Sequence, residues 1–129
     1  MRHEDESTRD GARVLLAGIR LINGLLGLVA PGLIARRFGS APKENPAAIY
    51  ALRLFGIRTI LIAIDLLHRD GRTRAHAVRV APLIHASDTM AAILARRSGR
   101  LPGQTGAAIV LISALNTLLA VVMQRPTRR

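Results

Sequence analysis

The chain has 129 residues, which suits a single domain, and half of them are hydrophobic. It contains no cysteine, so disulfides, thiolate metal sites and thiol catalysis are excluded. The formal net charge of +11 is compatible with binding to nucleic acid, with anionic lipid, or with the loops of a membrane protein. An aromatic content of 2% leaves little for base stacking, which disfavours nucleic acid as a partner.

The N-terminal part of the chain combines a polar segment with a first apolar run. Residues 1–11 predict a flexible polar tail, without the basic-then-apolar pattern of a cleaved signal peptide. The apolar run predicts a helix over about residues 12–34. Pro31 and Gly32 predict a kink or an end late in this helix, and the arginines that follow suit a short turn at lipid head groups.

Polar and small residues share a face of this first helix. Arg20 and Asn23 lie three residues apart, so their side chains are neighbours on the helix surface. Gly24 and Gly27 lie beside them, and glycine at such positions lets a neighbouring helix approach closely. The partner of these glycines can lie in the same chain or in a second copy.

The second predicted helix, over residues 46–69, has the length of a membrane span but carries Arg53, Arg58 and Asp65. Eleven of residues 47–67 are Ile, Leu or Phe, which supply roughly −3 to −7 kcal/mol of apparent insertion free energy. A central arginine costs about 2.5 to 3.5 kcal/mol on the same scale, so Arg58 cancels much of this gain. This helix therefore needs neighbours that neutralise Arg58.

The third predicted helix, over residues 75–97, is the weakest candidate for a span. It contains His85 and Asp88 on one stripe of small and polar residues, and Pro82 predicts a kink. A helix of this pattern turns its polar stripe toward the interior of a bundle.

The fourth predicted helix, over residues 105–124, is uncharged and gives the clearest spanning signal in the chain. Asn116 is one of its few polar residues. Residues 125–129 form a basic C-terminal tail.

Four apolar runs joined by short, turn-rich loops predict an all-α fold, an antiparallel four-helix transmembrane bundle that occupies residues 12–124. The lipid bilayer is then the first partner of the chain. Loops on the side of both termini carry ten arginines against six basic residues on the other side, which favours a multi-pass protein of the cell membrane with cytoplasmic termini.

Folding the chain about its loops brings a polar residue of every helix to a similar depth. This estimate places Arg58 opposite His85, one helical turn from Asp88, and makes Asp88 the preferred partner of Arg58. Asn23 and Asn116 are expected in the same layer with Arg20 close by, whereas Arg53 and Asp65 lie nearer the ends of their helix. The predicted polar cluster consists of Arg20, Asn23, Arg53, Arg58, Asp65, His85, Asp88 and Asn116.

Two interpretations of this cluster remain open. Arg58 and Asp88 form either a structural ion pair that fixes helix packing or part of a ligand or proton site. His85 is either a satisfied core histidine or an acid–base group, so His85, Asp88 and Arg58 are the catalytic candidates. No metal site is expected, because the nearby arginines oppose a cation, and no motif for a cofactor is present.

Three runs carry a resemblance to known proteins: RLINGLLGLVAPGLIARRFG, ALRLFGIRTILIAIDLL and APLIHASDT. They resemble small bacterial four-helix membrane proteins grouped as a domain of unknown function. In helix number and size the chain is also similar to DoxX-like membrane proteins. The resemblance implies an integral membrane protein and carries over no catalytic residue.

The leading hypothesis is a non-enzymatic integral membrane protein that binds a small anionic or lipid-like molecule, or uses its cluster to fix helix packing. A homodimer or a membrane partner protein fits the same features. The first alternative is a membrane enzyme that acts on a hydrophobic substrate by acid–base chemistry at His85 and Asp88. A small dimeric transporter and a soluble basic nucleic-acid binder rank lower.

Overall fold

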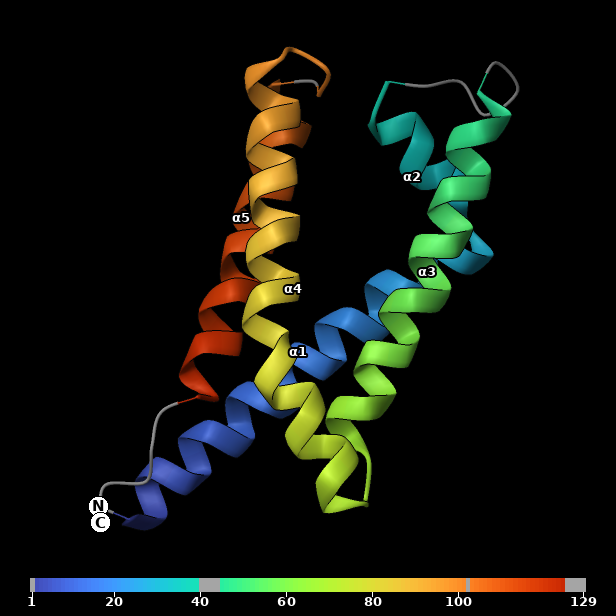
Figure 1. Cartoon of the computed structure of the whole chain (residues 1–129). Coiled ribbons are helices and arrows are strands. Elements are labelled where there is room, and N and C mark those ends of the chain that lie inside the picture. Colours follow the sequence, from blue (N-terminus) through green and yellow to red (C-terminus); the bar gives the residue numbers. More distant parts are fainter. Residues whose placement is uncertain (1, 40–44, 102, 125–129) are drawn as a thin grey trace.

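The computed structural model describes residues 2–39, 45–101 and 103–124 and is helical throughout, without a strand in these ranges. The all-α fold class is therefore confirmed. Figure 1 shows the arrangement of the helices, which are α1 (Arg2–Val29), α2 (Pro31–Arg37), α3 (Pro46–Leu67), α4 (Gly71–Arg97) and α5 (Gly103–Val122).

Four of the five helices, α1, α3, α4 and α5, are long and apolar enough to cross a membrane. This is compatible with the predicted four-helix bundle and gives the chain the architecture of a multi-pass membrane protein. As predicted, α5 is the most apolar of the four and α4 the least.

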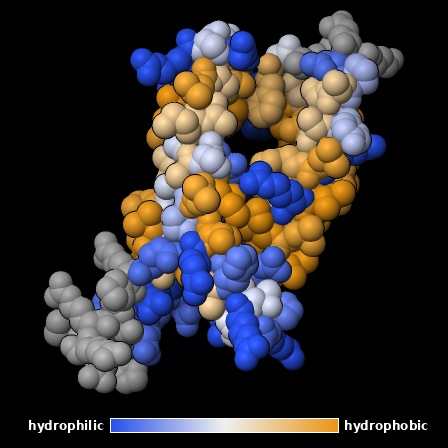
Figure 2. All heavy atoms as spheres, in the orientation of Figure 1, coloured by the Kyte–Doolittle hydropathy of each residue, from blue (hydrophilic) through white to orange (hydrophobic). Residues whose placement is uncertain are grey.

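The burial pattern is the reverse of that in a soluble bundle. The buried face of α3 consists mainly of small residues, including Gly56, Thr59 and Ala63, while large apolar side chains such as Leu61 and Ile64 point outward. Figure 2 shows hydrophobic residues over the middle of the molecule and hydrophilic residues gathered at its two ends. Small residues at helix contacts and large apolar residues toward lipid are typical of membrane helices.

The spans are arranged as two pairs. α1 packs most extensively on α3, and α4 packs most extensively on α5. Fewer contacts, between α1 and α5 and between α3 and α4, join the pairs. Figure 1 shows the pairs crossing in the lower half and diverging in the upper half, and Figure 2 shows the surface hollowed between them there.

The N-terminal segment differs from the predicted flexible tail, because α1 begins at Arg2 and includes residues 2–11. Acidic residues in its first turn, Glu4 and Asp5, favour a helix N-terminus through their interaction with the helix dipole. The Nε of Arg9 also donates to the carbonyl of Met123 at 3.4 Å, which holds the segment against the end of α5. Residues 2–11 are polar because this part of α1 extends beyond the apolar part of the helix. The predicted basic tail, residues 125–129, lies outside the described residues.

The predicted break at Pro31 and Gly32 is confirmed. α1 ends at Val29, Ala30 has a non-helical conformation, and α2 starts with Pro31 at a position where the missing N–H costs nothing. Pro82, by contrast, lies inside α4. Figure 1 shows α4 inclined differently in its lower and upper parts, as expected for a helix with an internal proline.

Close packing of α1 on α3 depends on glycine. A Cβ atom added at Gly56 would lie 2.6 Å from the backbone N of Leu28 and 2.7 Å from the carbonyl oxygen of Gly24. A Cβ added at Gly27 would meet the carbonyl oxygen of Leu52 at 3.0 Å. The predicted close approach at these glycines is therefore confirmed, and it occurs within one chain.

α4 begins four residues earlier than predicted because Asp70 caps its N-terminus. Its Oδ2 accepts hydrogen bonds from the backbone N–H of Thr73 at 2.8 Å and from the Thr73 hydroxyl at 2.9 Å. These hydrogen bonds, the backbone one first, lower the pKa of the Asp70 carboxyl from its ordinary value of 3.8. The folded protein therefore favours the ionised cap.

We expect Asp70→Ala to lower the melting temperature at pH 7, because the N–H of Thr73 loses its acceptor. Since the pKa of Asp70 is lower in the folded state, its contribution is present above pH 3.8 and is lost as the pH falls through the lower value. Thermal unfolding at pH 7 and pH 2 checks this, with Asp70→Asn as a cap that does not titrate. An equal difference between wild type and Asp70→Ala at both pH values would contradict it.

Candidate functional site

Arg20 occupies the buried face of α1. It follows Leu16 and precedes Gly24 at four-residue spacing, and all three are buried against neighbouring helices. The whole residue is only 3% exposed. An arginine so placed in a spanning helix requires a counter-charge, since hydrocarbon supplies no water to solvate it.

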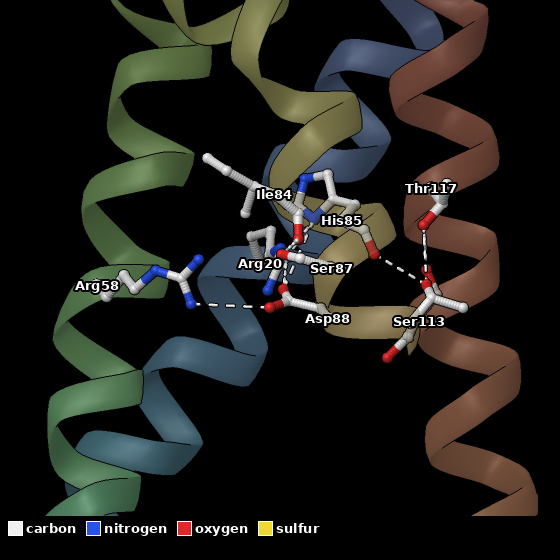
Figure 3. Close-up of polar contacts among 9 residues, drawn as sticks. Arg20, Arg58, Ile84, His85, Ser87, Asp88, Ser113 and Thr117 are labelled. Carbon is white, nitrogen blue, oxygen red and sulfur yellow. Dashed lines mark hydrogen bonds and ion pairs between the residues drawn. The ribbon is translucent and has the colours of Figure 1, made fainter. Parts of the chain in front are cut away.

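That counter-charge comes from Asp88 on α4. The Nη2 atom of Arg20 donates to Oδ2 of Asp88 at 2.6 Å, and the Nη1 atom of Arg58 on α3 lies 3.7 Å from Oδ1. Nη2 of Arg20 also contacts Nδ1 of His85 (Figure 3). Arg20, Arg58, His85 and Asp88, here called the charged cluster, thus join α1, α3 and α4.

The contact with Arg20 favours a neutral His85. A guanidinium has only donors, so Nδ1 of His85 must accept the hydrogen bond. The imidazole then carries its proton on Nε2 and is neutral. Two arginines and one carboxylate therefore leave the charged cluster with one excess positive charge.

Exposure differs sharply across the charged cluster. The side chain of His85 is 0% exposed and that of Arg20 is 4% exposed, while that of Asp88 is 24% exposed. The side chain of Arg58 is 51% exposed, and Figure 3 shows it reaching from α3 toward Asp88. The cluster is thus closed on the side of α1 and open on the side of Arg58.

A hydroxyl chain connects the cluster to the fourth span. The Oγ1 of Thr89 donates to the carbonyl of His85 at 2.8 Å and lies 2.9 Å from the Oγ1 of Thr117 on α5. The Thr117 hydroxyl in turn lies 3.0 Å from the carbonyl of Ser113. The Thr89–Thr117 contact joins α4 to α5, whereas the other two contacts each lie within one helix.

Four buried polar atoms have no hydrogen-bond partner among the described residues. One comes from each spanning helix, and two belong to the charged cluster. They are Nε of Arg20, Oγ1 of Thr59, Nε2 of His85 and Oδ1 of Asn116. Unpartnered polar atoms are costly in a membrane interior, so these four positions are where a further hydrogen-bond partner would stabilise the packed core.

Several residues of the predicted polar cluster lie outside the charged cluster. Asn23 is half-buried and makes no hydrogen bond to any described residue. Arg53 is exposed and, with Arg36, lines a cavity of about 450 Å³ at the α1–α2 corner. Asp65 is exposed. Asn116 on α5 is buried but belongs to neither ion pair of the charged cluster. None of these four residues makes a hydrogen bond or ion pair with the charged cluster in the described part of the chain.

The predicted ion pair of Arg58 with Asp88 is present, but Arg20 is the closer partner of Asp88. Sequence reasoning placed Arg20 near the layer without pairing it. It also missed Thr59, which is fully buried. Thr59 lies three residues after Gly56 and four before Ala63, so it shares the small-residue face of α3. This spacing could have predicted its burial.

The arrangement suits an anion better than a cation. No group of three or more His, Cys, Asp or Glu residues within the described ranges is placed to hold a metal ion. The two arginines would also repel a cation. The chemistry that the charged cluster offers is hydrogen-bond donation and positive charge.

Fold and site together define a multi-pass helical membrane protein in which an ion-paired cluster links three spans. Comparisons of this chain with models of protein families, with curated proteins and with solved structures gave no match. The resemblance to small bacterial membrane proteins therefore stays a prediction, and a function has to be argued from the geometry.

Proposed function

We propose that this chain is a non-enzymatic integral protein of the cell membrane that binds a small anionic, lipid-like molecule at Arg58. One observation carries the proposal: Arg58 is half exposed in a span and only partly neutralised. Asp88 already receives the closer hydrogen bond from Arg20, at 2.6 Å against 3.7 Å. The outer arginine therefore keeps unused donors and the excess charge of the cluster.

The surroundings of Arg58 suit an amphiphile. Leu54 and Leu61 lie four residues before and three residues after it, so they share its face of α3. Both are exposed, at 50% and 56%. An anionic head at the guanidinium, with an acyl chain along these leucines, satisfies the charge and stays in apolar surroundings.

The enzymatic alternative has weaker support. Acid–base chemistry requires His85 to reach a substrate, yet its side chain is fully buried and its Nδ1 is occupied by Arg20. The outward-facing apolar residues likewise disfavour a soluble nucleic-acid binder. The excess of basic residues on the side of both termini supports cytoplasmic termini as part of the proposal.

Binding of a fluorescent long-chain fatty acid to the protein in phosphatidylcholine nanodiscs tests this function. We expect Arg58→Gln to weaken binding about tenfold or more, because a charge-assisted hydrogen bond to the carboxylate is lost. The methyl ester of the same probe should bind wild type and variant equally weakly.

Arg53→Gln is the matched control, since it removes an exposed arginine of the same helix outside the charged cluster. It should bind the fatty acid as wild type does. Equal affinity of wild type and Arg58→Gln would reject Arg58 as the site. Loss of affinity to the same extent in Arg53→Gln would show a general charge effect instead.

A further inference from the structure

We propose that a second anion site, separate from the charged cluster, lies at the end of the molecule where α1, α4 and α5 meet, and that it binds a phosphate group. A cavity of about 450 Å³ opens there. Its charged lining residues come from α1 and α4. They are Glu6, Arg9, Asp10, Arg13, Arg74 and Arg79.

The charge of this cavity is positive. Four arginines line it together with two carboxylates, one of which, that of Asp10, already pairs with Arg13 at 3.1 Å. Glu6 is the other acidic residue in the wall. The remaining positive charge favours an anion over a cation or a neutral group.

Three of the arginines are held in place by backbone carbonyls of different segments. Arg13 donates to the carbonyl of Leu66 at 2.9 Å, and Arg74 donates to that of His68 at 3.3 Å. The contact of Arg9 with the end of α5 adds a third such anchor. Arg9 and Arg74 each use one guanidinium nitrogen in this way, so further donors remain for an oxyanion at little cost in side-chain entropy, whereas Arg13 uses all three nitrogens on Asp10 and Leu66.

Arg79 is the fourth arginine of the wall and also favours an anion. Arg79 is exposed and makes no hydrogen bond or ion pair with any residue that the structure describes. Gly71, the first residue of α4, lines the same cavity, but the ionised Asp70 already caps that end of the helix, so the positive field of the cavity is that of the arginines. A phosphate group offers the charge and the acceptor atoms that such a set of donors recognises.

The cavity lies at the height along the spans where lipid head groups are expected. α3 ends at Leu67, α4 begins at Gly71 and α5 ends at Val122, so three spans terminate beside it. Lipid head groups lie at the level where spanning helices leave the hydrocarbon core. The phosphate of an anionic phospholipid is thus one source of the ligand, and free phosphate from solution is the other.

The test is association of fluorescent phosphatidylglycerol with the full chain in detergent, against fluorescent phosphatidylcholine. We expect wild type to prefer phosphatidylglycerol, and the double variant Arg74→Gln/Arg79→Gln to bind it about tenfold more weakly. The matched control, Arg69→Gln/Arg72→Gln, removes two exposed arginines near the same end but outside the cavity, and should keep wild-type affinity.

Competition with inorganic phosphate separates the two sources. Displacement of the lipid at millimolar phosphate assigns the site to free phosphate, and no displacement assigns it to the lipid head group. Equal affinity of the two double variants, or no preference of wild type for phosphatidylglycerol, would overturn the proposal. Arg58→Gln should leave this binding unchanged, which keeps the outcome independent of the function proposed for the charged cluster.

Discussion

Asp88→Asn is expected to destabilise the protein by about 3 to 5 kcal/mol, the usual cost of removing one partner of a buried ion pair. Asp88 is the one carboxylate within ion-pair distance of Arg20 or Arg58 in the described part of the chain. Without its charge, the guanidinium of Arg20 stays buried and uncompensated. Thermal unfolding in detergent should show a large fall in melting temperature.

Two further variants show whether the loss of stability is due to the buried ion pair. Asp65→Asn makes the same chemical change at an exposed carboxylate of α3, and should change the free energy of unfolding by less than about 0.5 kcal/mol. Adding Arg20→Met to Asp88→Asn removes the uncompensated charge and should recover part of the lost stability. A melting temperature for Asp88→Asn equal to that of Asp65→Asn would contradict a structural role for this ion pair.

Gly56→Ala is expected to cost about 3 kcal/mol, at the upper end of what overpacking usually costs. The added methyl group would meet backbone atoms of Leu28 and Gly24 at 2.6 Å and 2.7 Å. Backbone atoms cannot turn aside as a flexible side chain does, so α1 and α3 must separate. The measurement is again the melting temperature in detergent.

Gly18→Ala is the matched control for this change, because a Cβ at Gly18 has no neighbour within 4 Å. Its expected effect has the opposite sign, a gain of up to about 1 kcal/mol from the higher helix propensity of alanine. Comparing the two substitutions therefore separates the effect of helix packing on stability from the effect of helix propensity. Stabilisation by both substitutions would show that α1 and α3 do not approach each other as closely as described.

The apolar runs of the sequence predicted most of the fold. Three of the four long runs each lie in one helix, and the first is divided between α1 and α2 at the break before Pro31. The N-terminus was not readable, because hydropathy identifies the apolar part of a helix and says little about a polar extension such as residues 2–11. The start of α4 depended on the cap by Asp70, which polarity alone assigned to a loop.

The sequence predicted the pairing of Arg58 with Asp88, but not that of Arg20 with Asp88. Counting residues from the loops brought Arg58 and Asp88 to one level, and that contact is present. The counting treats all helices as parallel rods, whereas α1 crosses the molecule obliquely (Figure 1). This crossing brings Arg20 onto Asp88 and leaves Asn23 without a polar contact among the described residues. The angle at which α1 crosses its neighbours follows from the packing at glycines. It cannot be predicted from the depth of residues in the membrane.

α4 is expected to cross the membrane with the charged cluster midway along it. Because the chain has no cysteine, Arg72→Cys and Ser98→Cys each introduce a single thiol at one end of α4. With cytoplasmic termini, a membrane-impermeant maleimide applied to intact cells should label Ser98→Cys alone, and lysis should expose both. Equal labelling of the two variants in intact cells would contradict the claim.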